Sequence, residues 1–156
     1  MNTHDKALRR RPTLGLPMTA LAGLALLALP RAVLHDLHVI EEGTFVNAAL
    51  VFVPPIVWIA VAVAKRLPNP FVTLLVVGAF YGVFLAVCHQ LLWDANWRGD
   101  PPRLGGTMGD LAPGTESLIL RTFTAVGSLF TGLIVGAICG LIAWGVGRLV
   151  GATRRD

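Results

Sequence analysis

Four mostly apolar runs, each about 20 residues long, restrict what this 156-residue chain can fold into. A helix of that length crosses the hydrocarbon of a bilayer and satisfies its own backbone hydrogen bonds there. The composition agrees, since 54% of the residues are hydrophobic and 14% are charged, against about a quarter charged in soluble domains. We therefore predict an all-α integral membrane protein, a four-transmembrane-helix bundle in one domain, residues 1–156. The expected spans are about residues 14–34, 45–64, 71–93 and 123–146, with an outer loop at about 94–120.

The charged residues predict the orientation of these spans, because lysine and arginine collect in short loops on the cytoplasmic side. One group of nine basic and two acidic residues lies in the terminal segments and in the loop between the second and third spans. The other loops carry four basic and seven acidic residues. We therefore expect a multi-pass protein of the cell membrane with both termini in the cytoplasm, N-in/C-in. The nine basic residues are Lys6, Arg9, Arg10, Arg11, Lys65, Arg66, Arg148, Arg154 and Arg155.

The basic N-terminal segment has two other interpretations. A signal peptide also begins with basic residues and an apolar run, but this run meets Arg31 without a small-residue cleavage site, so we expect a retained helix. A pI near 9.8 is also typical of nucleic-acid-binding proteins. Here, however, the basic residues flank apolar spans and have no aromatic or groove-reading pattern around them. The expected partner is the lipid bilayer and not nucleic acid.

Small residues recur every four positions in the third and fourth spans. Such a stripe forms a shallow groove along one helix face, so that a second helix can approach closely and gain dispersion contacts. We expect close-packed helix faces here, with the partner helix either in the same chain or in another protein. The positions are Gly78, Gly82 and Ala86 in the third span, and Thr124, Ser128, Gly132, Gly136 and Gly140 in the fourth.

Two consecutive prolines, Pro54 and Pro55, stand at the middle of the second span. Proline has no backbone N–H, so the carbonyls of Leu50 and Val51 lose their helical donors, which is costly in hydrocarbon. Water or a hydroxyl of a neighbouring helix is expected to satisfy these carbonyls. The two interpretations are a hinge or ligand site at the membrane midplane, and a static kink shielded by packing. The candidate hydroxyls are those of Thr124, Ser128 and Thr131.

The segment LHDLHVIEEG, residues 34–43, carries two histidines and a glutamate directly after the first span. We expect it to extend the helix, which would place His35, His38 and Glu42 on one face at i, i+3 and i+7. His89, near the outer end of the third span, is expected on the same side of the membrane. These side chains are candidates for a transition-metal site, or for haem ligation by one histidine from each helix. We favour the other interpretation, a solvated helix end in the headgroup region, which needs no cofactor.

The centres of the four spans contain no Asp, Glu, Lys, Arg or His, although such groups usually mark function inside a membrane. This absence argues against a proton-coupled carrier with an intramembrane carboxylate. Cys88 and Cys139 are expected at different depths, too far apart for a disulfide. The sequence has no evident nucleophile arrangement, phosphate-binding glycine loop or pair of catalytic acids. Catalysis is therefore not favoured.

Together these features favour a small multi-pass membrane protein that acts without catalysis, through helix–helix contacts of its glycine stripes. Its expected protein partner is a second copy of itself or a larger membrane complex to which it is an accessory subunit. Two alternatives stay open. One is an outer-face metal- or haem-binding protein, and the other is a small channel or carrier that uses the helix kinked at Pro54 and Pro55. No motif in the chain indicates a known family.

Overall fold

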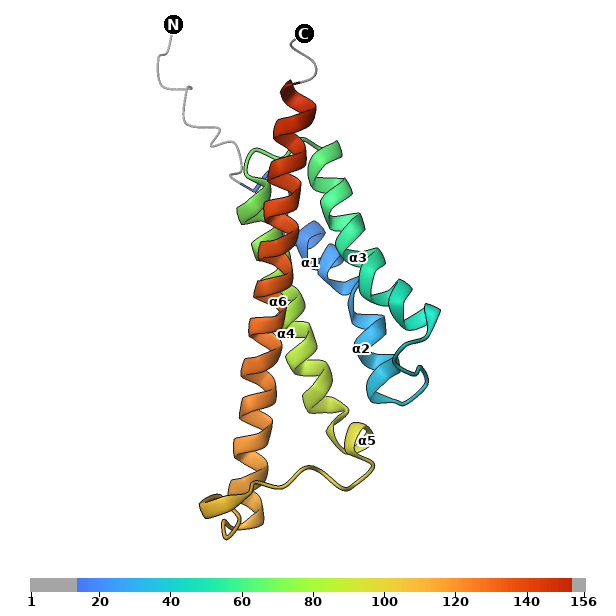
Figure 1. Cartoon of the computed structure of the whole chain (residues 1–156). Coiled ribbons are helices and arrows are strands. Elements are labelled where there is room, and N and C mark those ends of the chain that lie inside the picture. Colours follow the sequence, from blue (N-terminus) through green and yellow to red (C-terminus); the bar gives the residue numbers. More distant parts are fainter. Residues whose placement is uncertain (1–13, 153–156) are drawn as a thin grey trace, which may run out of the picture.

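The computed structural model describes residues 14–152, and most of them are helical (Figure 1). These residues contain no strand. The elements in chain order are α1 (Met18–Leu26), α2 (Leu29–Asp36), α3 (Phe45–Ala64), α4 (Pro70–Leu91), α5 (Trp93–Trp97), the 3-10 helix η1 (Gly106–Met108) and α6 (Pro113–Ala152). The described chain has four helical segments long and apolar enough to cross a membrane, with α1 and α2 together counted as one. The prediction of an all-helical chain with four candidate spans is confirmed.

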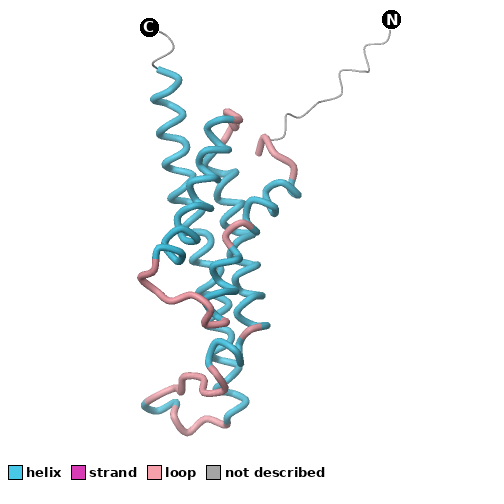
Figure 2. Tube along the Cα trace, turned by 90° about the vertical axis from the view of Figure 1, so that its right-hand side faces the viewer, coloured by secondary structure: helices cyan, strands magenta, loops and turns pink. Residues whose placement is uncertain are grey.

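The loops of the described chain lie at two opposite ends of an elongated bundle (Figures 1 and 2). One end, called the inner end below, holds the turn between α3 and α4 and the last turns of α6. The opposite, outer end holds the connections from α2 to α3 and from α4 to α6. Six of the basic residues behind the predicted orientation lie outside the described residues: Lys6, Arg9, Arg10, Arg11, Arg154 and Arg155.

The first and last spans differ in detail from the expected ones. Leu27 and Ala28 separate α1 from α2, so the first span is a broken helix. Pro30 stands in the first turn of α2, where its missing N–H removes no helical hydrogen bond. Helix α6 begins at Pro113, earlier than the expected 123, and its 40 residues make it about 60 Å long, roughly twice the hydrocarbon thickness. The outer connection is correspondingly shorter than expected and contains α5 and η1.

Helices α4 and α6 form the most extensive helix contact in the described chain, and their glycines face each other. Gly78 lies against Gly132 and Gly136, and Gly82 lies against Gly132. A β-carbon added at Gly136 would be 2.6 Å from the carbonyl oxygen of Leu74, much closer than van der Waals contact. Only residues without a side chain allow the two backbones to approach this closely. The two glycine stripes therefore contact each other within the chain.

The other positions of the stripes continue this contact or border it. A β-carbon at Gly140 would lie 2.9 Å from the Cα atom of Phe71 at the start of α4. Ser128 is buried, and both Thr124 and Ser128 donate their hydroxyls to carbonyls four residues earlier in α6. Ala86, one turn beyond Gly82, is half-buried. The contact is thus closest over the glycines and widens toward the outer end.

Trp58 of α3 connects the broken first span to the core. Its side chain is fully buried, and its ring meets Tyr81 of α4 edge to face at 6.0 Å. The indole Nε1 donates a 2.8 Å hydrogen bond to the carbonyl oxygen of Leu24 in the last turn of α1. In a continuous helix the N–H of Ala28 would serve that carbonyl, but it bonds to Ala25 at the break. The N–H of Leu27 bonds to the Leu24 carbonyl instead, at 3.2 Å, and Trp58 is the second donor to the same oxygen.

We expect Trp58→Phe to lower the free energy of unfolding by about 1–2 kcal/mol, because the Leu24 carbonyl loses one of its two hydrogen bonds and the smaller ring leaves part of a fully buried site unfilled. The measurement is denaturant unfolding of the purified protein in mild detergent. The matched control is Trp97→Phe, because Trp97 is more exposed and its indole makes no hydrogen bond in the described chain. Equal stability of the two variants would contradict this role of Trp58.

Candidate functional site

The segment after α2 turns back at the outer end instead of extending the helix, so the expected helical extension over 34–43 is wrong. Helix α2 ends at Asp36, and His38 has a left-handed backbone conformation with φ of 56°. The N–H of His38 bonds to the carbonyl of His35, and the N–H of Val39 bonds to that of Leu34. This pair of hydrogen bonds is the Schellman motif that commonly ends helices. His38 is exposed on the turn and does not share a helix face with His35.

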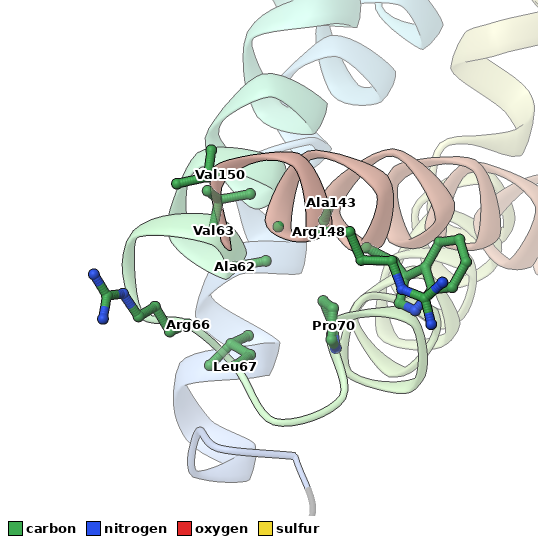
Figure 3. Close-up of a pocket in the computed structure, with 10 residues that line it drawn as sticks. Ala62, Val63, Arg66, Leu67, Pro70, Ala143, Arg148 and Val150 are labelled. Carbon is green, nitrogen blue, oxygen red and sulfur yellow. The ribbon is translucent and has the colours of Figure 1, made fainter. Parts of the chain in front are cut away.

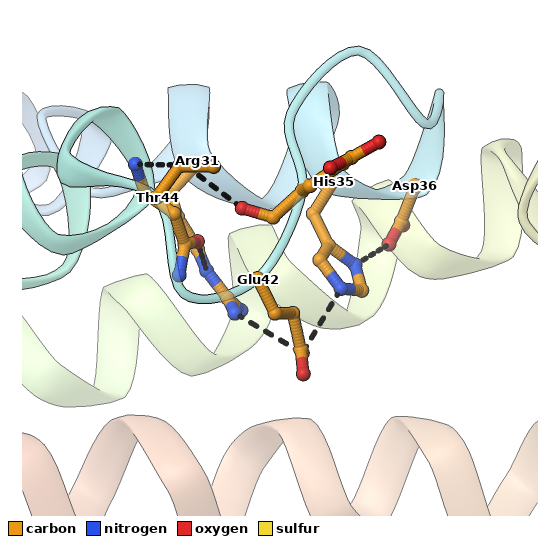
Figure 4. Close-up of polar contacts among 7 residues, drawn as sticks. Arg31, His35, Asp36, Glu42 and Thr44 are labelled. Atoms are coloured by element: carbon orange, nitrogen blue, oxygen red, sulfur yellow. Dashed lines mark hydrogen bonds and ion pairs between the residues drawn. The ribbon is translucent and has the colours of Figure 1, made fainter.

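The turn nevertheless brings Glu42 back to His35 (Figure 4). One carboxylate oxygen of Glu42 lies 3.3 Å from Nε2 of His35 and 4.0 Å from a terminal guanidinium nitrogen of Arg31. Arg31 also donates from Nε to the side-chain oxygen of Asn47 in the first turn of α3, at 3.3 Å. Thr44 begins α3 as its N-cap, accepting from the N–H of Asn47. The predicted candidates His35 and Glu42 therefore meet through a loop and not through helical spacing.

The centre of this polar cluster is Asp36, which is 1% exposed. His89 of α4 places Nδ1 2.6 Å from one carboxylate oxygen of Asp36, and His35 places Nδ1 3.6 Å from the other. Sequence reasoning selected both histidines but did not select Asp36. The sequence offers one signal, the four-residue spacing from the small apolar Ala32, which places Asp36 on a face of α2 that the structure shows to be buried.

This arrangement joins α2 to α4 through a buried carboxylate between two imidazoles. Both histidines direct Nδ1 at Asp36, which orients the rings. No hydroxyl of the described chain hydrogen-bonds to either ring. In that part of the chain, no group of three or more His, Cys, Asp or Glu side chains is arranged to hold a metal ion. The geometry is that of a polar network that holds the outer end together, with a hydrogen bond between His89 and Asp36 and close contacts of His35 with Asp36 and Glu42.

A groove of about 570 Å³ lies between α3 and α6, beside the two prolines, and its volume is within the usual range of ligand pockets. Helix α3 continues through both prolines; Pro55 lines the groove, whereas Pro54 is buried. Ala28, Arg31 and Tyr81 also line it. The other lining residues are almost all apolar: Leu50, Val51, Phe52, Ile56, Trp58, Ile59, Thr131, Val135, Ile138, Cys139 and Ile142.

The groove contains polar groups to which no side chain of the described chain donates a hydrogen bond. The prolines remove the N–H donors that would serve the carbonyls of Leu50 and Val51, and both residues line the groove. No side chain in residues 14–150 donates to either carbonyl, since Thr124 and Ser128 bond within α6. Thr131, the third candidate donor, lies in the groove and makes no hydrogen bond. The groove thus combines apolar walls with two acceptors and one hydroxyl.

Comparison of the chain with protein-family models, with curated proteins and with solved structures finds no significant match.

Proposed function

We propose that this protein is a non-enzymatic accessory subunit of the cell membrane that receives a transmembrane helix of another protein in the groove between α3 and α6. In this proposal it crosses the membrane four times and has both termini in the cytoplasm. The observation that carries the proposal is the groove itself, an open apolar surface that the prolines of the kink border and that the Thr131 hydroxyl lines without a hydrogen bond. The α4–α6 pair provides the scaffold on which α3 is held.

The exposed surface supports the membrane placement. Large apolar side chains cover the outside of α3 and α6, and a surface of this kind is suited to lipid and not to water. The described acidic residues all lie at the outer end or in its loops, and Lys65, Arg66 and Arg148 lie toward the inner end. This asymmetry fits a cytoplasmic inner end. Exposed apolar residues include Phe45, Phe52, Ile56, Phe123, Phe130, Ile134 and Ile138.

The internal use of the glycine stripes supports the groove as the contact surface. Gly78, Gly132 and Gly136 already pack against one another, so a partner helix that used them would have to displace α4 or α6. Helix α3 packs more loosely, with 17% of its most apolar window buried against 39% for α4. The surface left for a partner is therefore the one that α3 and α6 leave open between them.

The polar groups indicate the chemistry of the partner helix. A serine, threonine or asparagine at the depth of the kink would donate to the carbonyls of Leu50 or Val51, and an acceptor would suit Thr131. Of the three hydroxyls considered above, a second copy of this chain offers only that of Thr131, one donor for two carbonyls, because Thr124 and Ser128 are already bonded. This favours a different protein as the partner.

The two alternative functions have less support. A channel or carrier needs a polar path, but among the described residues the only ionisable side chains that line the groove are Arg31, Tyr81 and Cys139. A metal or haem site needs free imidazole nitrogens that converge. His35 and His89 instead direct Nδ1 at Asp36, and His38 lies apart on the exposed turn.

The proposal predicts a protein adduct specific to the groove. A photoreactive amino acid at Val51, which lines the groove, should cross-link to one membrane protein in intact cells. The matched control is Val53, an exposed valine on the same helix that does not line the groove. Mass spectrometry of the adduct identifies the partner and separates another protein from a second copy.

A substitution that fills the groove shows whether the adduct depends on the groove. Ile138→Trp should abolish the Val51 adduct by occupying the groove, whereas Leu133→Trp, on the same helix outside the groove, should leave it intact. Equal adducts at Val51 and Val53, or a Val51 adduct that survives Ile138→Trp, would overturn the proposal. An adduct with a second copy of the chain would replace the accessory role with self-association.

A further inference from the structure

A second pocket, of about 520 Å³, opens at the inner end, where the turn after α3 meets the last turns of α6 (Figure 3). Its walls are apolar and include Ala62, Leu67 and Ala143, all of them buried. Figure 3 shows Arg66 on one side, with its guanidinium directed outward from the turn, and Arg148 on the other side. The pocket therefore has an apolar interior between two guanidinium groups.

The positive charge at this pocket is not neutralised by the described chain. Arg66 and Arg148, with the neighbouring Lys65, form no ion pair in residues 14–150. The guanidinium of Arg148 lies 4.0 Å from the centre of the Trp144 ring, a cation–π contact that orients it without cancelling its charge. Helix α4 begins at Pro70, which lines the pocket, so the positive end of its dipole also faces this region.

We propose that this pocket binds an anionic phospholipid, with its headgroup at the rim that Arg66 and Arg148 make positive and part of an acyl chain against the apolar walls. Arginine matches phosphate oxygens with paired N–H donors, and basic pockets between helices on the cytoplasmic side are suited to anionic headgroups. Trp144 has the amphipathic ring that is typical of the membrane interface. The proposal depends on the membrane placement given above, but not on the α3–α6 groove or on its partner.

Lipid is the favoured source of the phosphate because of the pocket walls. Free phosphate would contact only the arginines and would leave the exposed apolar surface of Trp144 and Val150 uncovered. A phospholipid covers that surface with its chain while the guanidinium groups hold its headgroup. The site should therefore prefer phosphatidylglycerol to phosphatidylcholine, whose headgroup has no net charge.

The test places the full chain in nanodiscs of phosphatidylcholine with a minority of phosphatidylglycerol. The protein is then released from the nanodiscs in a native mass spectrometer, and the lipids that stay bound to it are counted. Arg66→Gln with Arg148→Gln should weaken phosphatidylglycerol retention about 30-fold, at about five-fold for each arginine near the headgroup. Both side chains are exposed, so the fold should persist, and circular dichroism checks this. The matched control, Arg98→Gln with Arg103→Gln, removes the same charge from exposed positions in the outer loop.

Each result of this lipid-retention measurement either supports or overturns the proposed phospholipid site. Loss of phosphatidylglycerol in the inner-end variant alone, with no displacement by inorganic phosphate, supports it. Equal retention by wild type and the inner-end variant, or equal loss in both double variants, overturns it. Displacement by inorganic phosphate would assign the pocket to a soluble anion instead. None of these results changes the groove cross-links, so failure here is distinguishable from failure of the proposed partner contact.

Discussion

Replacing Gly136 with isoleucine is expected to force α4 and α6 apart and to lower the free energy of unfolding by about 3 kcal/mol or more. The first atom of the new side chain would already lie 2.6 Å from the Leu74 carbonyl oxygen and 2.9 Å from the Cα atom of Gly78. Both are backbone atoms, so no rotamer change relieves the clash. Denaturant unfolding in mild detergent, followed by circular dichroism, measures the loss.

The control is another glycine of the same helix. A β-carbon at Gly127 meets nothing within 4 Å, so Gly127→Ile should leave stability within about 1 kcal/mol of wild type. The same pair of variants also tests the alternative use of the stripe. If Gly136→Ile lowers the oligomeric mass but leaves unfolding unchanged, the glycines pack between chains and not between α4 and α6.

Replacing Asp36 with alanine is expected to cost about 2–3 kcal/mol of unfolding free energy. The substitution removes the 2.6 Å contact with His89 and the 3.6 Å contact with His35, and it leaves two polar rings beside a space that the carboxylate filled. The cost is below that of a fully buried ion pair because both histidine side chains are partly exposed. Thermal or denaturant unfolding in detergent measures it.

Asp94→Ala is the control for Asp36, because Asp94 is an exposed acid at the same end of the bundle and forms no ion pair in the described chain. It should change stability by less than about 0.5 kcal/mol. Asp36→Asn should fall between the two, since it keeps the shape and one acceptor but loses the charge. Equal unfolding of the Asp36→Ala and Asp94→Ala variants would contradict the structural role of the buried carboxylate.

Much of the fold was predictable because it depends on properties of neighbouring residues. Runs of apolar residues about 20 long predict helical spans without reference to the rest of the chain. The start of α6 at Pro113 was missed because Glu116 and Arg121 interrupt the apolar pattern, although they do not interrupt the helix. The break between α1 and α2 was missed because Leu27 and Ala28 are ordinary helix-forming residues.

The candidate sites were less predictable. The end of α2 depends on His38 adopting a left-handed conformation, for which glycine is the usual signal. The burial of Asp36 depends on His89, which is 53 residues away in the chain. The groove depends on how α3 diverges from α6, and the Pro54–Pro55 pair indicated only that some backbone carbonyls lose their donors.

The sequence by itself determined that the chain forms long apolar helices, that small residues mark a close helix contact, and that cationic and acidic residues separate along the chain. These properties follow from composition and from the period of a single helix. Only the tertiary structure decided that the glycines of α4 and α6 pack against each other, that Asp36 lies between two histidines, and that α3 leaves a groove beside α6. Each of these depends on the relative position of helices, which is set by side-chain packing between segments distant in sequence and not by the pattern within either segment.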